Sequence, residues 1–109
     1  MSSAVAATRG QVYWATVEGR RKPWLVVSNN PRNRALGSCL AVRLTTSDKP
    51  TLASIVELHQ ADRPLTGRVL CDDIAVLYPD EDGFEYLSAL TPATMRRVDD
   101  GLRVALALD

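Results

Sequence analysis

The sequence has little of what several common classes of protein require. Its longest uninterrupted apolar runs, WLVV at 24–27 and VALAL at 104–108, fall far short of the roughly 20 residues of a membrane-spanning helix. It has two cysteines, Cys39 and Cys71, and one histidine, His59, and neither cysteine has a second ligand at metal-binding spacing. The sequence therefore predicts a cytoplasmic protein with buried free thiols, no metal, no cofactor and no membrane contact.

The net charge of the chain is zero, but the two halves of the chain differ in charge. Residues 1–50 carry eight Arg or Lys against two Asp or Glu, whereas residues 51–109 carry five against eleven. The N-terminal half alone is therefore +6. This imbalance is expected of a nucleic-acid binder, provided that the fold keeps the surfaces of the two halves apart. The alternative is that the charges pair with each other on one small globule.

Short segments rich in β-branched and aromatic residues alternate with turn formers along the chain. They predict one mainly β domain over residues 1–109, with residues 1–9 as a flexible N-terminal tail. A turn over residues 18–23 separates the first two strands, and residues 29–37, rich in Asn, Pro and Arg, are predicted to form a mobile loop. The predicted strands are residues 11–17, 24–28, 38–44, 54–58, 68–70, 74–77 and 84–90.

One amphipathic helix of about four turns is predicted at the C-terminus. Thr91 can cap a helix whose first position is Pro92. Apolar residues then recur every three or four positions, at Met95, Val98, Leu102 and Leu106. Gly101 in the middle of this helix suggests either a close contact with a neighbouring backbone or simply that the helix tolerates a glycine there. Short strands followed by one helix predict an α+β or small-barrel fold.

Cations and hydroxyls are placed as a phosphate site requires. Arg20, Arg21 and Lys22 cluster between two apolar strands, and Thr45 and Thr46 end a third. Cations bind phosphodiester oxygens, and hydroxyls on rigid strand ends can donate to a developing negative charge. The pattern thus predicts an RNA-binding site that needs no metal. From spacing alone, a solvated hairpin tip and an ordinary threonine pair remain the alternative.

Six segments, in order along the chain, resemble the MazF/PemK family of toxin endoribonucleases. They are RGQVYW from Arg9, the basic hinge ending in Pro23, LVVSN from Leu25, VRLTTS from Val42, LCDDI from Leu70 and LTPATMRRVDDGL from Leu90. The resemblance runs from Arg9 to Leu108. It implies a small SH3-like curved barrel with a C-terminal α-helix, a homodimer, and metal-independent cleavage of single-stranded mRNA. It also implies a cognate antitoxin that holds the toxin inactive.

The resemblance further implies which residues form the site. The family has a catalytic arginine before the hinge proline, where this chain has Lys22 with Arg21 one position earlier, and a catalytic threonine that corresponds to Thr45. A second departure is Asp73, where the family usually has glutamine and where a carboxylate would repel phosphate. The predicted catalytic residues are therefore Lys22, Arg21 and Thr45, and the predicted RNA-binding residues are Arg20, Arg32, Arg34, Arg43, Thr46 and Ser47.

Three functions remain open. They are an active RNA-cleaving toxin, an RNA-binding or antitoxin-binding relative weakened by Lys22, and a gyrase-directed toxin of the same fold. The third is least supported, because the resemblance implies a C-terminal aromatic signature for such toxins and this chain ends ALALD. Trp14, Trp24 and Tyr13 offer faces on which unpaired bases could stack, although Trp24 is expected in the core. The cleaved RNA sequence and the identity of the antitoxin do not follow from the sequence.

Overall fold

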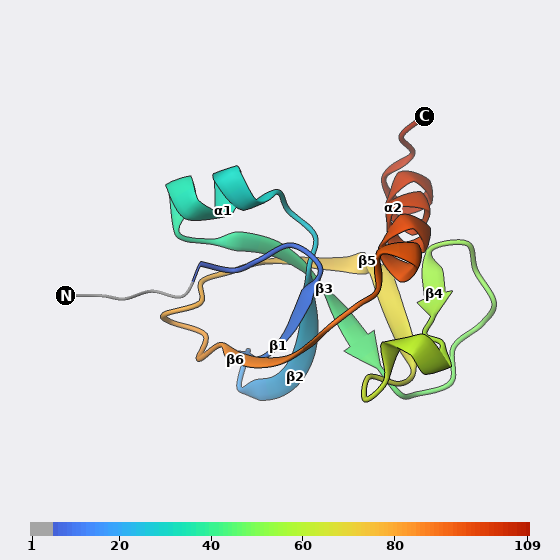
Figure 1. Cartoon of the computed structure of the whole chain (residues 1–109), viewed down its shortest axis with the longest axis horizontal. Helices are drawn as coiled ribbons and strands as arrows, with labels where there is room; N and C mark the ends of the chain where they lie inside the picture. Colours follow the sequence, from blue (N-terminus) through green and yellow to red (C-terminus); the bar gives the residue numbers. More distant parts are fainter. Residues whose placement is uncertain (1–5) are drawn as a thin grey trace.

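The computed structural model describes residues 6–109, in which six antiparallel strands form one sheet with two α-helices (Figure 1). In chain order the elements are β1 Gln11–Val17, β2 Arg20–Val26, α1 Asn30–Leu36, β3 Cys39–Thr45, β4 Ile55–Glu57, the 3-10 helix η1 Gln60–Asp62, β5 Arg68–Leu77, β6 Glu85–Ala89 and α2 Pro92–Leu106. The predicted α+β, mainly β class is confirmed. The strand order is β4-β5-β3-β2-β1-β6, and across the described residues the end strands β4 and β6 do not pair. Closure into an SH3-like barrel is therefore not confirmed.

Strand β1 has the predicted bounds, but the predicted turn over residues 18–23 is wrong. Glu18 and Gly19 have φ angles of 51° and 76°, and these two residues alone connect β1 to β2. The cations that follow therefore lie on a strand and not in a hinge. Strand β2 pairs with β3 only from Trp24 onward, so Pro23 lies where β1 is its neighbour and a missing N–H is tolerated.

Helix α1 replaces the mobile loop predicted over residues 29–37, and that prediction is wrong. The Asn29 side chain accepts a hydrogen bond from the Arg32 N–H at 2.9 Å, and Gly37 ends the helix with a φ of 65°. The buried Asn33 side chain donates to two main-chain carbonyls, each at 3.1 Å. The turn formers of this segment are helix caps, and a buried amide fixes the helix on the domain.

The two short strands predicted before and after residues 71–73 are one strand, β5, with a bulge. Its pairing with β3 jumps from Val42 opposite Ile74 to Arg43 opposite Leu70, so three residues of β5 have no partner on β3. Strand β5 turns sharply near its middle (Figure 1). The bulge lets one strand pair with β3 on both sides of the bend and with β4 before it.

Helix α2 begins where it was predicted. The Thr91 hydroxyl accepts a hydrogen bond from the Thr94 N–H at 3.2 Å and caps the helix. Of the predicted apolar stripe, Met95 and Val98 are buried, whereas Leu106 is 51% exposed. Leu102 is partly buried against the same cluster, so the stripe packs on the core as far as Leu102. In the described part of the chain, neither α1 nor α2 has the length and apolar character that a membrane span requires.

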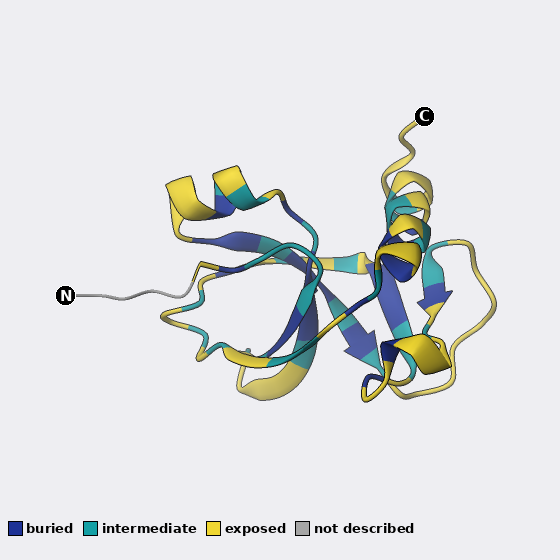
Figure 2. Cartoon of the chain, viewed as in Figure 1, coloured by how far each residue is buried: buried dark blue, intermediate teal, exposed yellow. Residues whose placement is uncertain are grey.

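Two hydrophobic clusters occupy the two faces of the sheet. Figure 2 shows that buried residues are concentrated in the strands. Because neighbouring strand residues point to opposite faces, Val12 packs in the cluster that meets α2, and Tyr13 packs with Trp24 in the other. The predicted burial of both thiols is confirmed, with Cys71 in the first cluster and Cys39 in the second. Burial raises the pKa of each thiol to about 11.

Part of the tail predicted over residues 1–9 lies outside the described residues. Within the rest, Ala7 is buried. Arg9 donates through Nε to the Val27 carbonyl at 3.0 Å and forms an ion pair with Asp99 of α2. The packed domain therefore includes residues 7–9.

Candidate active site

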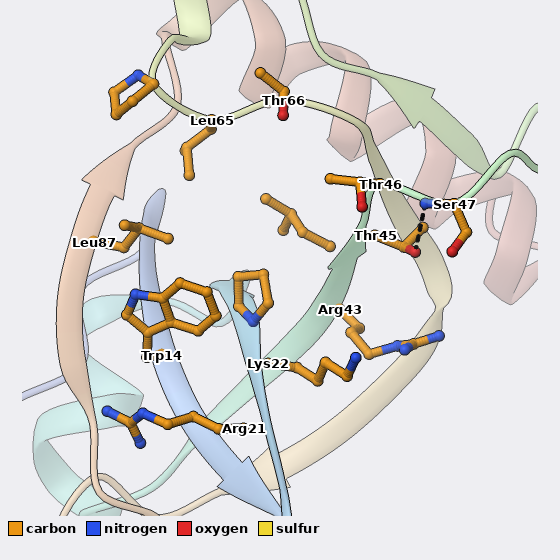
Figure 3. Close-up of a pocket in the computed structure, with 13 residues that line it drawn as sticks. Trp14, Arg21, Lys22, Arg43, Thr45, Thr46, Ser47, Leu65, Thr66 and Leu87 are labelled. Carbon is orange, nitrogen blue, oxygen red and sulfur yellow. Dashed lines mark hydrogen bonds between the residues drawn. The ribbon is translucent and has the colours of Figure 1, made fainter.

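A cleft of about 410 Å³ opens where β2 and β3 separate (Figure 3). Pairing between these strands ends with Trp24 opposite Arg43, so the first residues of β2 and the end of β3 have no mutual partners. The loop between η1 and β5 closes the opposite side (Figure 3). The lining residues are Trp14, Arg21, Lys22, Pro23, Arg43, Leu44, Thr45, Thr46, Ser47, Pro64, Leu65, Thr66 and Leu87.

The cations of the cleft do not all point the same way. Lys22 and Arg43 approach one another, whereas Arg21 points away from them (Figure 3). Arg21 forms an ion pair with Glu85 at 2.9 Å and donates to the Gly83 carbonyl at 3.1 Å. Successive strand residues point to opposite faces, which explains why two adjacent cations separate. The structure therefore brings Lys22, and not Arg21, to the side chain of Arg43.

The hydroxyl of Thr45 is fixed at the end of β3. Its oxygen accepts a hydrogen bond from the Ser47 N–H at 3.1 Å (Figure 3). A hydroxyl that accepts one bond can still donate its proton, so Thr45 remains a donor to a bound anion. Gly67 approaches this strand end with a φ of 97°, and a Cβ on it would lie 2.2 Å from the Thr45 carbonyl oxygen. Only glycine fits this contact.

One wall of the cleft is apolar, and most of it was not predicted. Trp14 of β1 is half-buried and faces the cleft with Leu87 of β6 and Leu65 of the loop (Figure 3). A partly exposed indole beside aliphatic side chains is a surface on which an unpaired base can stack. The other aromatic candidates, Trp24 and Tyr13, are 5% and 3% exposed and belong to the core.

Asp62, which was also not predicted, holds the loop that carries Leu65. Its carboxylate is 1% exposed and accepts hydrogen bonds from the Thr94 hydroxyl at 2.7 Å and from the N–H groups of Thr91 and His59 at 3.1 and 3.2 Å. Burial alone would raise the pKa of Asp62, but these hydrogen bonds outweigh it and lower the pKa below its ordinary value. Asp62 thus joins η1 to the start of α2.

The structure brings some of the predicted RNA-binding residues to the cleft. Those that line it are Arg43, Thr46 and Ser47. Arg20 lines a neighbouring hollow. Arg32 and Arg34 lie on α1, where Arg32 donates to the Ser38 carbonyl at 2.7 Å. A single groove that joins α1 to the cleft stays a prediction.

The polar groups of the cleft suit a phosphodiester. An ammonium, a guanidinium and a hydroxyl can all donate to phosphate oxygens, and the apolar wall lies beside them. Within residues 6–109, no three His, Cys, Asp or Glu side chains are grouped as metal ligands.

Comparison with known proteins gives one consistent family. Residues 8–106 match the family described as PemK-like, MazF-like toxin of type II toxin-antitoxin system. The chain is 47% identical over 103 residues to Endoribonuclease MazF4 of Mycobacterium tuberculosis, covering 94% of this chain and 95% of that protein. It is also similar to a solved endoribonuclease from a mycobacterial species, with 45% identity, a TM-score of 0.87 and coverage of 98% and 97% of the two chains. A mycobacterial endoribonuclease solved with its cognate antitoxin has 46% identity, the same TM-score, and coverage of 95% and 98%.

Proposed function

The chain belongs to the PemK-like, MazF-like toxin family, and we propose that it is the toxin of a type II toxin–antitoxin system, an endoribonuclease that cleaves single-stranded mRNA. The observation that carries the proposal is the cleft itself. Lys22, Arg43 and Thr45 offer donors for one phosphate, and the wall around Trp14 lies beside them. A phosphate with an unpaired base next to it is the unit of single-stranded RNA that fits this arrangement.

The proposed reaction is attack by a ribose 2′-hydroxyl on the adjacent phosphorus. The bond from the 2′-oxygen to phosphorus forms as the bond to the 5′-oxygen breaks, which yields a 2′,3′-cyclic phosphate and a 5′-hydroxyl. The 2′-oxygen loses its proton to solvent, and the 5′-oxygen takes one from a protonated side chain that solvent then reprotonates, so no net proton is consumed. The non-bridging oxygens gain negative charge. The reaction consumes no water and requires no metal ion.

The roles follow from the chemistry of each side chain. Lys22 donates the proton to the 5′-oxygen, because an ammonium can release a proton whereas the guanidinium of Arg43 stays protonated. Arg43 and the hydroxyl of Thr45 donate to the non-bridging oxygens, where they stabilise the charge that develops. Arg21 is held by Glu85 and supports the wall of the cleft without touching the phosphate.

Cleavage of a defined single-stranded RNA by purified variants tests these roles. Thr45→Ala should lower kcat by about 10² to 10³, the usual effect of removing one donor to a developing charge. Lys22→Ala should lower kcat more than Arg21→Ala does. Arg103→Ala is the matched control, because Arg103 is a cation of α2 that pairs with Asp100 and does not line the cleft. A larger loss for Arg21→Ala than for Lys22→Ala would contradict the assignment.

Two further measurements test the chemistry. A single 2′-deoxy substitution at the cleaved nucleotide should block the reaction, and cleavage of that strand would contradict 2′-hydroxyl attack. Lys22→Arg should lower activity if the site depends on a proton from an amine. If the parent binds RNA without cutting it, the protein is an RNA-binding relative and not an active toxin.

We also propose that a cognate antitoxin covers the cleft and that two copies form a homodimer in the cytoplasm. The similar mycobacterial endoribonuclease solved with its cognate antitoxin supports the first proposal. On α2, Val104 and Leu106 are 55% and 51% exposed, and these apolar side chains suit contact with a second copy. RNA and antitoxin should compete for the protein, and simultaneous binding would contradict a shared site. Sedimentation as a single chain at micromolar concentration would contradict the homodimer.

A further inference from the structure

Arg43 is held in place by a carboxylate from the β5 bulge. Its Nε donates to Asp73 Oδ2 at 2.9 Å, and the two side chains are 28% and 43% exposed. Asp73 is the last of the three residues, 71–73, that have no partner on β3. Among the described residues, this is the one hydrogen bond that the Arg43 side chain forms. The bond therefore determines where the guanidinium lies.

The bulge that carries Asp73 is anchored from the core side. Cys71 Sγ lies 3.8 Å from the Val98 carbonyl oxygen, and the Cys71 N–H donates to the Ser54 carbonyl at 3.0 Å. A Cβ on Gly101 would lie 2.7 Å from the same sulfur, so α2 packs directly on the bulge. The contact between α2 and the bulge thus sets the place of Asp73, two residues further along the strand.

Arg43 also lies between two hollows. It lines the cleft and a second hollow of about 530 Å³, and Lys22 lines both. The other residues of the second hollow are Val17, Glu18, Arg20, Trp24, Asp73, Ile74 and Ala75. Because Lys22 and Arg43 line both cavities, a strand of RNA that extends from the cleft into the second hollow would pass these two side chains.

We propose that Asp73 is a positioning residue for RNA cleavage, which acts by directing Arg43 at the phosphate between the two hollows. This inference rests on the proposed endoribonuclease function. A guanidinium is planar, so a carboxylate bound at Nε fixes the direction of the terminal amino groups. The same carboxylate cancels one positive charge at the passage, which weakens the attraction of RNA in its ground state. Asp73 therefore favours the chemical step and disfavours simple binding.

Because Asp73 is proposed to favour the chemical step and to disfavour binding, its replacement should change kcat and RNA affinity differently. A purely structural role would not have this effect. Asp73→Asn keeps the shape of the side chain and removes its charge. The variant should bind an uncleavable 2′-deoxy oligonucleotide at least as tightly as the parent, while kcat at saturating RNA falls roughly tenfold or more. This decrease in kcat should be smaller than the decrease of about 10² to 10³ expected when a donor is removed outright. Because the ion pair is partly exposed, the variant should remain folded at the assay temperature.

Asp72→Asn is the matched control. Asp72 is the exposed neighbour in the same bulge, and its replacement removes the same charge without removing a contact to Arg43. It should therefore change oligonucleotide affinity in the same direction as Asp73→Asn and leave kcat at the parent value. Equal kcat values for the two variants would overturn the proposal, and so would weaker oligonucleotide binding by Asp73→Asn.

A double-mutant cycle completes the test. If Asp73 acts through Arg43, then Asp73→Asn should have no further effect on kcat in an Arg43→Ala background. Losses that add independently would overturn the proposal. The parent is assayed first, so that failure of the proposed function can be distinguished from failure of the proposed role of Asp73. A parent that does not cleave RNA contradicts the proposed function, whereas an active parent with an unaffected Asp73→Asn variant contradicts the role of Asp73 alone.

Discussion

Replacing Asp62 by asparagine should destabilise the domain although the two side chains have nearly the same shape. In the parent, Oδ1 accepts from the Thr91 N–H, and Oδ2 accepts from the Thr94 hydroxyl and the His59 N–H. An asparagine has one accepting oxygen and one donating NH2 group. Whichever way the amide is turned, a partly buried main-chain N–H then faces a donor. The Thr94 hydroxyl can rotate to adapt, but the N–H groups of Thr91 and His59 cannot.

The expected cost follows from these contacts. A hydrogen bond to an ionised group contributes about 1.5 to 3 kcal/mol, and a buried donor left without an acceptor costs about 1 to 3 kcal/mol. Loss of one N–H partner and weakening of the others should therefore lower the free energy of unfolding by about 3 kcal/mol. For a domain of this size, that corresponds to a fall in Tm on the order of 10 °C. Urea denaturation followed by tryptophan fluorescence measures the difference.

The pH dependence checks the same reasoning independently. The pKa of Asp62 is lowered in the folded state by its hydrogen bonds, in spite of burial. The stability that Asp62 contributes is therefore fully present above its unfolded pKa of about 3.9 and is lost as the pH falls through the folded pKa. The difference in unfolding free energy between parent and Asp62→Asn should be constant between about pH 7 and pH 5 and shrink below about pH 4.

Asp48→Asn is the control for loss of a carboxylate charge, because the Asp48 side chain is fully exposed and lies 3.6 Å from Arg68 in a surface ion pair. Its urea midpoint should match that of the parent. The reasoning is refuted if Asp62→Asn unfolds at the parent midpoint, or if its difference from the parent grows as the pH falls.

Substitutions at Gly67, Gly101 and Trp14 probe close contacts and the apolar wall. Gly67→Ala should abolish cleavage, because its Cβ would lie 2.2 Å from the Thr45 carbonyl oxygen at a φ of 97°; retained kcat would show that the loop can move without loss. Gly101→Ala should lower stability by about 1 to 3 kcal/mol through its contact with the Cys71 sulfur, and Cys71→Ala should relieve part of that loss in the double variant. Trp14→Ala should weaken oligonucleotide binding by about 1 to 3 kcal/mol, as loss of one stacked base does, whereas Trp14→Phe should retain most of the affinity. If Trp14→Ala binds the oligonucleotide as tightly as the parent does, no base stacks on this wall.

Local patterns predicted the regular part of the fold because the signals there are local. The bounds of β1 follow from its β-branched and aromatic residues, and Thr91 with Pro92 marks the start of α2. Helix α1 was missed because Asn29 and Gly37 serve equally as turn residues and as helix caps. What separates the two outcomes is the buried Asn33 amide, whose partners lie outside the helix.

In the candidate site, too, some residues could be predicted from local sequence patterns and others could not. Lys22 and Thr45 could be selected from the sequence because a cation cluster and a threonine pair adjoin recognisable strands. Leu65 and Leu87 could not, since each reaches the cleft only through contacts between distant segments. The pairing of β1 with β6 places Leu87, and the bonds of Asp62 to the start of α2 place Leu65. No local pattern in the sequence encodes either contact.

Ion pairs between the two halves of the chain offset part of the uneven charge. Ion pairs join the N-terminal half to the C-terminal half at Arg9–Asp99, Arg21–Glu85 and Arg43–Asp73. Pairs as exposed as these add little stability, but each one cancels a charge that would attract a polyanion. The net charge of +6 on the N-terminal half therefore overstates how strongly this half attracts RNA. For these three arginines, the structure shows the alternative that the sequence left open, which is pairing of charges between the halves.

Four cations line the cleft and the adjoining hollow, namely Arg20, Arg21, Lys22 and Arg43, and Arg21 is held by Glu85. Each phosphate contact to a single strand contributes about −0.7 to the slope of log affinity against log salt concentration, so three contacts give a slope of only about −2. Charge of this size attracts RNA without holding it tightly. Much of the affinity must then come from a base on the wall around Trp14. A base held in a duplex cannot reach such a wall, because its faces are covered by its stacked neighbours. On the proposed function, we therefore expect the cleft to bind single-stranded RNA more tightly than a duplex.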